Sequence, residues 1–194
     1  MAVKPIRHIT DPVLRRKTKR VLKIDKTIHQ LVDDMLDTLE KCDGAGLAAP
    51  QIGISLKVAV LWLPDEHPFA IINPEVVKRI GQREVEEGCL SLPGYQGRVK
   101  RAVSVTVKCL DIEGKPLKIR ARELLAQALE HEIDHLNGVV FTDLLESPDK
   151  LYKLPPKTAE KPGGQSPQKE LVIGDSVAPV VLKDVVSKGN DNDA

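Results

Sequence analysis

The 194-residue chain is short of aromatic residues, of cysteines and of long apolar runs. With 3% aromatic against 41% hydrophobic residues, its core must be built mostly from Leu, Ile, Val and Ala. No apolar run is long enough to cross a membrane, and the N-terminus lacks the apolar centre of a signal peptide. Three cysteines, an odd number, do not predict a disulfide framework. We therefore expect a cytoplasmic, reducing location, where a cysteine can remain a thiolate.

Charge is balanced over the whole chain but uneven along it. The net charge of +1 argues against bulk electrostatic capture of nucleic acid. Residues 1–26 nevertheless carry nine Lys or Arg against Asp11 and Asp25. We favour a solvated basic face for this segment over a phosphate or RNA contact. We expect no sequence-specific nucleic-acid partner and no membrane partner.

Hydrophobic spacing predicts two helices and several strands. Apolar residues recur at three- and four-residue intervals over 25–44, with Asp25 as a candidate N-cap. A second helix is predicted over about 122–137, where Gly138 would end it. The predicted strands cover 56–63, 70–77, 102–111 and 117–121, the last two as an antiparallel hairpin. This order predicts an α+β fold with antiparallel sheets.

Composition divides the chain into two parts. From about Ser147 onward Pro, Lys and Gly become frequent, and such a segment cannot bury much apolar surface. We expect one folded domain over 1–147 and a Pro/Lys/Gly-rich extension over 148–194 that is largely disordered. Within the extension, only 171–186 is apolar enough to dock as a strand.

The stretch His131-Glu132-Ile133-Asp134-His135 has the spacing of a metal site on a helix. Residues four apart face the same way, so both histidines fall on the apolar, core side of the helix. Buried imidazoles need partners, and a metal ion is a good one. By the same periodicity Glu123, Glu130 and Asp134 are expected to face water. Taken alone, the motif leaves two interpretations open: a metal hydrolase, or a core histidine pair satisfied by backbone hydrogen bonds.

Two histidines need a third ligand, and Cys89 is the better candidate. It lies in "EEGCLSLPG" (86–94), where Gly88 lets the backbone approach closely. One thiolate and two imidazoles leave a fourth position open, as catalytic metals require. Asp143 and Glu146, downstream of the motif, remain possible ligands. Cys42 and Cys109 are expected to be core thiols.

A third segment, "GAGLAAPQIG" (44–53), makes the combination specific. The three segments closely resemble the G-x-G-x-A-A-x-Q, E-G-C-x-S and H-E-x-x-H motifs of the peptide deformylases. The resemblance runs from about residue 4 to 147, which would make that domain the catalytic one. It implies antiparallel sheets packed around a central helix that carries the H-E-x-x-H motif, with an amphipathic helix near the N-terminus.

The resemblance also implies an activity and a set of roles. The activity is removal of the formyl group from N-formylmethionine at the start of nascent chains, with transient proximity to the ribosome. Cys89, His131 and His135 would bind one divalent metal, typically Fe(II) in this family, with Zn, Ni or Co possible in purified protein. Glu132 would be the general acid/base, acting on a metal-bound water, and Gln51 with the Leu90 N–H would stabilise the oxyanion. The expected substrate contacts are Gly44, Ala45 and Gly46 in the groove, and Val85, Glu87, Leu124 and Ala128 around the methionine side chain.

Two departures and two alternatives accompany this interpretation. Some family members have an Arg seven residues after the metal-binding Cys, and here that place is Gln96, with Arg98 nearby. The C-terminal segment is interrupted by prolines, so ribosome contact through a terminal helix is not expected. One alternative is another metallohydrolase, such as a peptidase, on the same scaffold. The other is a non-catalytic metal-binding module, in which Glu132 would have no evident task.

Overall fold

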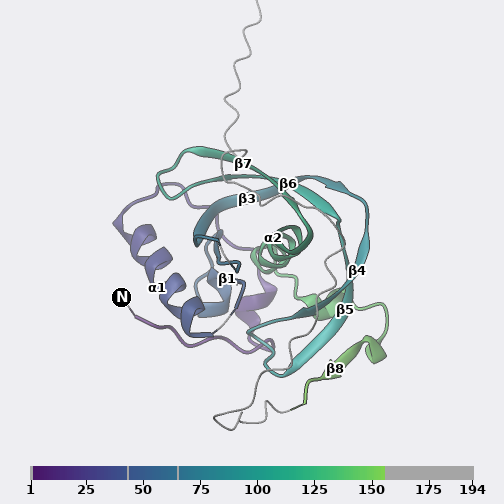
Figure 1. Cartoon of the computed structure of the whole chain (residues 1–194). Helices are drawn as coiled ribbons and strands as arrows, with labels where there is room; N and C mark the ends of the chain where they lie inside the picture. Colours follow the sequence, from purple (N-terminus) through teal and green to yellow (C-terminus); the bar gives the residue numbers. More distant parts are fainter. Residues whose placement is uncertain (1, 43, 65, 156–194) are drawn as a thin grey trace, which may run out of the picture.

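The computed structural model describes residues 2–42, 44–64 and 66–155, which form two sheets around a central helix (Figure 1). The helices are α1 (Lys26–Cys42) and α2 (Glu123–Leu136). The strands are β1 (Gly46–Ala48), β2 (Val58–Leu61), β3 (Phe69–Ile80), β4 (Arg83–Gly88), β5 (Tyr95–Arg101), β6 (Ser104–Leu110), β7 (Pro116–Arg122) and β8 (Leu151–Lys153). Short 3₁₀ turns cover η1 (Pro12–Arg15), η2 (Ala49–Ile52), η3 (Phe141–Leu144) and η4 (Pro148–Lys150). Neither helix in these ranges is long and apolar enough to span a bilayer.

All the strand pairs are antiparallel, which confirms the predicted α+β class. One sheet has the order β1-β2-β3-β6-β7, and the other has the order β4-β5-β8. The predicted hairpin is confirmed as β6 and β7, with Val107 opposite Ile119. Burial alternates along β6 as expected for a strand, because Val105, Val107 and Cys109 are buried while Lys108 between them is exposed.

The start of the C-terminal extension belongs to the fold, which corrects the expectation that order ends near residue 147. Leu151–Lys153 form β8 and pair with β5, so that Gly97 lies opposite Leu151. Leu151 also packs against the small buried cluster of Val85, Val99 and Phe141. Residues 156–194, including the candidate strand at 171–186, lie outside the described residues.

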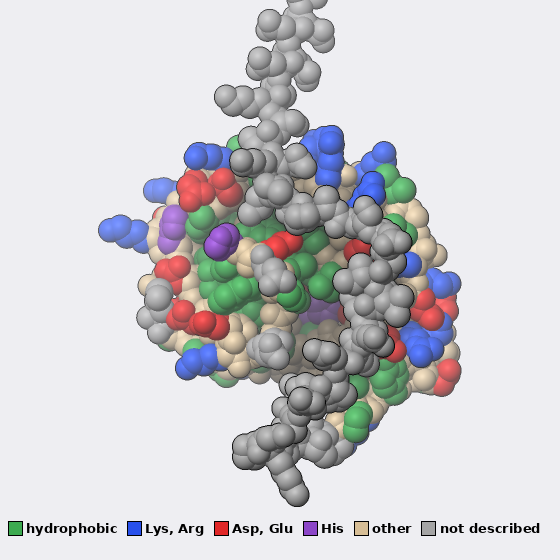
Figure 2. Space-filling view, viewed as in Figure 1, with side chains coloured by type: hydrophobic (Ala, Val, Ile, Leu, Met, Phe, Trp, Pro, Cys, Tyr) green, Lys and Arg blue, Asp and Glu red, His purple; other side chains and the backbone are tan. Residues whose placement is uncertain are grey.

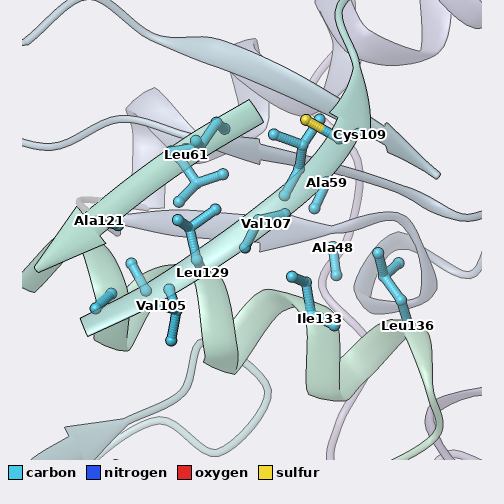
Figure 3. Close-up of a cluster of buried hydrophobic side chains, with 14 of the residues drawn as sticks. Ala48, Ala59, Leu61, Val105, Val107, Cys109, Ala121, Leu129, Ile133 and Leu136 are labelled. Atoms are coloured by element: carbon cyan, nitrogen blue, oxygen red, sulfur yellow. The ribbon is translucent and has the colours of Figure 1, made fainter. Parts of the chain in front are cut away.

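Helix α2 packs its apolar side against the inner face of the five-stranded sheet (Figure 3). Figure 3 shows the side chains that meet there: Ala48, Ala59, Leu61, Val105, Val107, Cys109, Ala121, Leu129, Ile133 and Leu136. Small residues at Ala48 and Ala59 let the helix approach the sheet closely, so the larger side chains of α2 interdigitate without voids. This contact fixes the side of α2 that is left for His131 and His135.

Helix α1 covers the other face of the same sheet around β1 and β2, in a cluster that extends to Ile72 in β3 and Leu110 in β6. Strand β2 is buried on both faces: Ala59 and Leu61 pack with α2, whereas Val58 and Val60 pack with α1. The buried apolar residues of α1 are Ile28, Leu31, Val32, Met35 and Leu39, while Leu36, which shares their spacing, is half-buried. Asp25 caps the helix, accepting the Thr27 N–H at 3.0 Å.

An N-terminal strap, residues 7–18, binds all three motif segments. The Arg7 N–H donates to the Gln51 carbonyl at 2.7 Å, and the Ile9 N–H donates to the Ser91 carbonyl at 2.8 Å. Farther along, the Thr18 N–H donates to the carbonyl of Leu136, the last residue of α2, at 3.0 Å. The strap therefore joins three segments that are far apart in sequence, without supplying a side chain to the site.

Asp34 on α1 holds the residues that precede the strap, and its ionisation makes this contact sensitive to acid. Its carboxylate accepts the Ala2 N–H at 3.0 Å and lies 3.1 Å from the Lys4 ammonium. These contacts, the Ala2 hydrogen bond first, lower the pKa of the buried Asp34 from 3.8 to about 2. The stabilisation is therefore present above the unfolded pKa of 3.8 and is lost as the pH falls through about 2.

Replacing Asp34 by Asn should lower the free energy of unfolding near pH 7 by up to about 2 kcal/mol. The difference between wild type and Asp34→Asn should shrink between about pH 4 and pH 2, where the wild-type carboxylate also becomes neutral. Urea unfolding of both proteins near pH 7 and near pH 3 measures this. An equally large difference at both pH values would show that the charge of Asp34 is not what stabilises the segment.

Candidate active site

Two segments bring Cys89, His131 and His135 to one point. The histidines come from α2, and Cys89 comes from the turn after β4. One ligand atom from each of the three residues lies within 4.8 Å of the others, and Cys89 Sγ is 3.3 Å from His135 Nε2. The sequence-predicted triple is thus assembled, although Cys89 precedes His131 by 42 positions (131 − 89).

The polar side of α2 differs from the expectation that its acidic residues face water. Glu123 is exposed, but Glu130 is buried, accepting the Ala102 N–H at 2.8 Å and bonding Arg79 at 2.6 Å. Asp134 is only half-buried and pairs with Arg101 at 2.5 Å. Both carboxylates meet arginines from strands, which the helical periodicity of α2 by itself cannot reveal.

Behind the histidines lies a buried ionic network centred on Glu87. The Nδ1 of His131 donates to Glu87 at 2.6 Å, and Arg101 donates two hydrogen bonds to the same carboxylate at 2.6 and 2.8 Å. Burial raises the pKa of Glu87, but the bonds from Arg101 and His131 more than reverse this and hold it at about 2. With Nδ1 of His131 engaged in this way, Nε2 is the ring nitrogen that remains for a metal once it has lost its proton.

The three side chains fit a divalent metal. A tetrahedral site with bonds of about 2.0–2.3 Å places neighbouring ligands about 3.3–3.8 Å apart, and the Cys89–His135 separation of 3.3 Å agrees. Burial and the neighbouring His131 lower the pKa of His135, so its imidazole stays neutral, as a ligand must be. Cysteine with two histidines is a donor set that suits zinc and iron alike.

The other candidate ligands are occupied elsewhere. Asp143 pairs with Arg15, and Glu146 pairs with Lys100 and Lys150. Burial raises the pKa of Cys109 to about 12, so this thiol stays protonated inside the core. Cys42 borders the same hollow as Cys89 but does not belong to the ligand cluster.

Glu132 lies between the two histidines in sequence and borders the same hollow as Cys89 and His131, but it does not belong to the ligand cluster. It is 3% exposed, and within the described part of the chain one carboxylate oxygen, Oε2, has no hydrogen-bond partner. Burial raises its pKa from 4.5 to about 7, which suits a group that must both take and give a proton near neutrality. Gly46 makes room for this carboxylate, since a Cβ at that position would lie 2.4 Å from Glu132 Oε1.

Gln51 is oriented by its own backbone neighbourhood. Its Oε1 accepts the Ala48 N–H at 2.8 Å, which turns the NH₂ group towards Cys89 Sγ (3.5 Å) and Ser91 Oγ (3.3 Å). Beside it, the Leu92 N–H donates to the Cys89 carbonyl and the Ser91 N–H donates to the Cys89 sulfur. Those two bonds close the turn without using the Leu90 N–H.

The site opens into a hollow of about 510 Å³. Most of the predicted substrate residues line it: Gly44, Ala45, Gly46, Glu87, Leu124 and Ala128. Val85 does not, because it packs with Val99 and Phe141 below the surface. Figure 2 looks onto this face, where hydrophobic side chains gather with histidine and acidic side chains among them.

Several lining residues were not predicted from the sequence. They come from the turn before β5, from β5 and from the residue after β8: Leu92, Pro93, Gly94, Tyr95, Gln96 and Leu154. Gln96 thus borders the hollow, whereas Arg98 is exposed and lies 3.8 Å from Glu86. A second, smaller hollow of about 390 Å³ shares Gly44, Ala45 and Leu124 and adds Trp62.

Comparison with known proteins places this geometry in a family. The model of the polypeptide deformylase family matches residues 3–151. The chain belongs to the polypeptide deformylase family. It is 50% identical to the peptide deformylase of Dehalococcoides mccartyi over 80% of this chain and 94% of that one. It is 52% identical to the peptide deformylase of Alkaliphilus metalliredigens, in a match that covers 74% of this chain and 97% of that one.

Solved peptide deformylases share the fold. The crystal structure from Legionella pneumophila is 46% identical, with a TM-score of 0.74 over 77% of this chain and 89% of that one. The structure from Synechococcus elongatus, solved in complex with actinonin, is 40% identical in sequence. Its TM-score is 0.73, and the match covers 76% of this chain and 82% of that one. The deformylase activity implied by the sequence motifs, metal-dependent hydrolysis of the formyl group of N-formylmethionine, is therefore confirmed over a peptidase or a non-catalytic module.

Removing the cation of the deformylase's buried network should be costly. Arg101→Met should lower the free energy of unfolding by about 3–5 kcal/mol, because it leaves the Glu87 and Asp134 charges without their partner. Arg98→Met, in the same strand but exposed, should change it by less than about 0.5 kcal/mol. Urea unfolding of both variants decides the matter, and similar losses would contradict the role of Arg101.

Gly46 provides a test of the space around Glu132. Gly46→Ala should keep the metal but lower kcat for deformylation by at least about tenfold, because either the carboxylate or β1 must shift. The measurement is formate release from a formyl-Met tripeptide, together with metal content. An unchanged kcat at full metal content would mean that the position of Glu132 tolerates the displacement.

Proposed function

We propose that this deformylase binds its metal through Cys89, His131 and His135 and uses Glu132 as general acid/base. The observation that carries the proposal is the buried Glu132 carboxylate, which stands beside three convergent ligands yet outside their cluster. A purely structural metal site would usually be closed by four protein ligands. In such a site the buried Glu132 carboxylate would have no function to offset the cost of its burial. Within the described residues no fourth side chain joins the cluster.

The metal we propose is Fe(II), with Zn, Ni or Co as ions that purified protein could also hold. The donor set itself suits iron and zinc equally, so the choice of iron rests on the family resemblance. When bound, the metal supplies Lewis acidity, lowering the pKa of water and polarising the formyl oxygen. Glu87 supports the site from behind by fixing the ring of His131.

Glu132 moves the proton in this proposal. Its carboxylate takes a proton from the attacking water, holds it within the site, and delivers it to the amine nitrogen of the departing methionine. A pKa of about 7 is well placed for both transfers. Because Glu132 is only 3% exposed, the proton is not exchanged freely with bulk water between the two steps.

Gln51 and Leu90 donate the hydrogen bonds that stabilise the negative charge developing on the formyl oxygen. The Gln51 amide is held by Ala48, so its NH₂ group already points to the cysteine side of the site. The Leu90 N–H is the second donor, in the turn that carries Cys89. Fixed donors of this kind contribute roughly 3–4 kcal/mol each to transition-state stabilisation.

Strand β1 and the hollow beside it supply the substrate site. Among the residues that the structure describes, β1 is an edge strand paired with β2 alone, so its other edge can pair with an extended peptide. Gly44, Ala45 and Gly46 would then align the backbone, while Leu124 and Ala128 contact the methionine side chain. Glu87 is a weaker contact because its carboxylate is bonded to His131 and Arg101, and Val85 is weaker because it lies below the surface. We propose that the peptides that bind in this hollow are nascent chains near the ribosome.

Glu132→Gln tests the proposed role. This variant should retain its metal but lose about 10²–10⁴-fold in kcat, because the amide cannot shuttle a proton. The assay follows formate and free amine from formyl-Met peptides, with metal content measured on the same anaerobic preparation. Glu123→Gln is the matched control, since it removes a carboxylate from the same helix at an exposed position.

Turnover and metal content, measured on the same preparation, distinguish the possible roles of Glu132. Loss of turnover together with loss of metal would make Glu132 a support for the ligands, not a proton carrier. Wild-type turnover in Glu132→Gln would remove the residue from the mechanism altogether. The control should match wild type in both turnover and metal content.

A further inference from the structure

The outer face of the five-stranded sheet carries a regular grid of side chains that the deformylase reaction does not use. Strand register places three rows across β3, β6 and β7. The rows are Glu75, Lys108 and Lys118; Lys78, Thr106 and Arg120; and Ile80, Ser104 and Arg122. Five of these nine side chains are cations, all five are exposed, and Glu75 is the single acid. We call these nine residues the basic grid.

None of the five cations in the basic grid has a carboxylate within salt-bridge distance among the described residues. The neighbouring arginines that do pair, Arg79 with Glu130 and Arg83 with Glu123, lie outside the grid. Lys108 and Lys118 even stand directly opposite each other, an arrangement that destabilises a sheet. The stability of the fold therefore does not explain this distribution of charge.

The grid also lies on an open part of the sheet. Helix α1 covers the outer face near Ile72 and Leu110, which are paired in register, but its cluster goes no farther along β6. Helix α2 packs on the inner face, over which β3, β6 and β7 arch in Figure 1. In Figure 2, Lys and Arg side chains line the upper edge, where Figure 1 shows β6 and β7.

We propose that the basic grid binds the phosphate backbone of RNA. Neighbouring strands are about 4.8 Å apart and alternate residues about 6.8 Å apart, so the cations form a compact array on a rigid support. Ser104 and Thr106, half-buried between them, add hydroxyl donors for phosphate oxygens. The grid has no aromatic side chain on which bases could stack, so contact is to the backbone and independent of sequence.

The choice of RNA over an anionic membrane rests on the proposed function. The substrates are nascent peptides, which are made on an RNA-rich particle, so RNA is the polyanion nearest to them. A net charge of +1 does not oppose this, because a local array acts within about 10 Å at moderate salt. The same net charge predicts that binding is weak and strongly salt-dependent.

The test uses the full-length, metal-loaded protein with a labelled 20-nucleotide RNA, first single-stranded and then as a duplex. Fluorescence anisotropy between about 50 and 200 mM salt gives the slope of log Kobs against log salt. Wild type should bind with a negative slope. In the double variant Lys118→Gln/Arg120→Gln the slope should become shallower by about 2, one unit for each lost phosphate contact.

The matched control is Arg16→Gln/Lys17→Gln. It removes the same charge from two exposed residues of the N-terminal segment that also lack a salt bridge among the described residues. This control should bind RNA with the wild-type slope. An equal loss in both double variants would overturn the proposal by showing that overall charge is responsible. Failure of the wild type to bind RNA at about 50 mM salt would also overturn it.

Two further measurements complete the test. Vesicles containing phosphatidylserine should bind the protein more weakly than RNA does, and the reverse order would overturn the proposal in favour of a membrane surface. Turnover of a short formyl-Met tripeptide should be unchanged in both double variants. A failure of RNA binding thus leaves the proposed catalytic function intact, whereas a failure of that function appears only in the tripeptide assay.

Discussion

The buried pairing of Arg101 with Glu87 is the interaction on which the rest of the structure depends. It joins β5 to β4, and through Asp134 and His131 it joins both strands to α2. Removing two charges from water is costly, and the cost is offset here by a bidentate geometry and by a further hydrogen bond from His131 to the same carboxylate. Because the network has donors and acceptors in fixed positions, it allows one docking of the three-stranded sheet against α2. Glu87 therefore sets both the orientation of His131 and, two residues later, the position at which the chain presents Cys89.

The other constraints on the site are backbone contacts that leave the reactive side chains free. The N-terminal strap binds the carbonyls of Gln51, Ser91 and Leu136, one from each motif segment. Ala48 holds the Gln51 amide, and the absence of a side chain at Gly46 leaves space for Glu132. Gln51 and Glu132 are thus positioned by neighbours that take no part in the proposed chemistry. Such support is what holds a catalytic arrangement within a fraction of an ångström.

The sequence allowed the cluster of Cys89, His131 and His135 and the β6–β7 hairpin to be predicted, because each depends on short-range spacing or on an uncommon residue type. It did not reveal β4 or β5, whose segments "REVEEG" and "YQGRVKR" are dominated by charged and polar residues. Glu87 in β4, Arg101 in β5 and Glu130 in α2 are buried, against the usual preference of charged residues for water. What stabilises them is a partner from another element, and such pairings are invisible to any periodicity measured along one segment. The same limit explains why the lining contributed by Leu154 was not foreseen.

Glu87 and Glu132 show how one site gives two glutamates opposite tasks. Both are buried, and burial raises the pKa of each. Glu87 receives two hydrogen bonds from Arg101 and one from His131, so its pKa falls to about 2 and it remains a fixed negative charge. Glu132 has an unpartnered oxygen among the described residues, so the effect of burial prevails and its pKa rises to about 7. Residue type alone does not distinguish a structural carboxylate from one suited to proton transfer; the presence or absence of direct hydrogen bonds from a buried cation does.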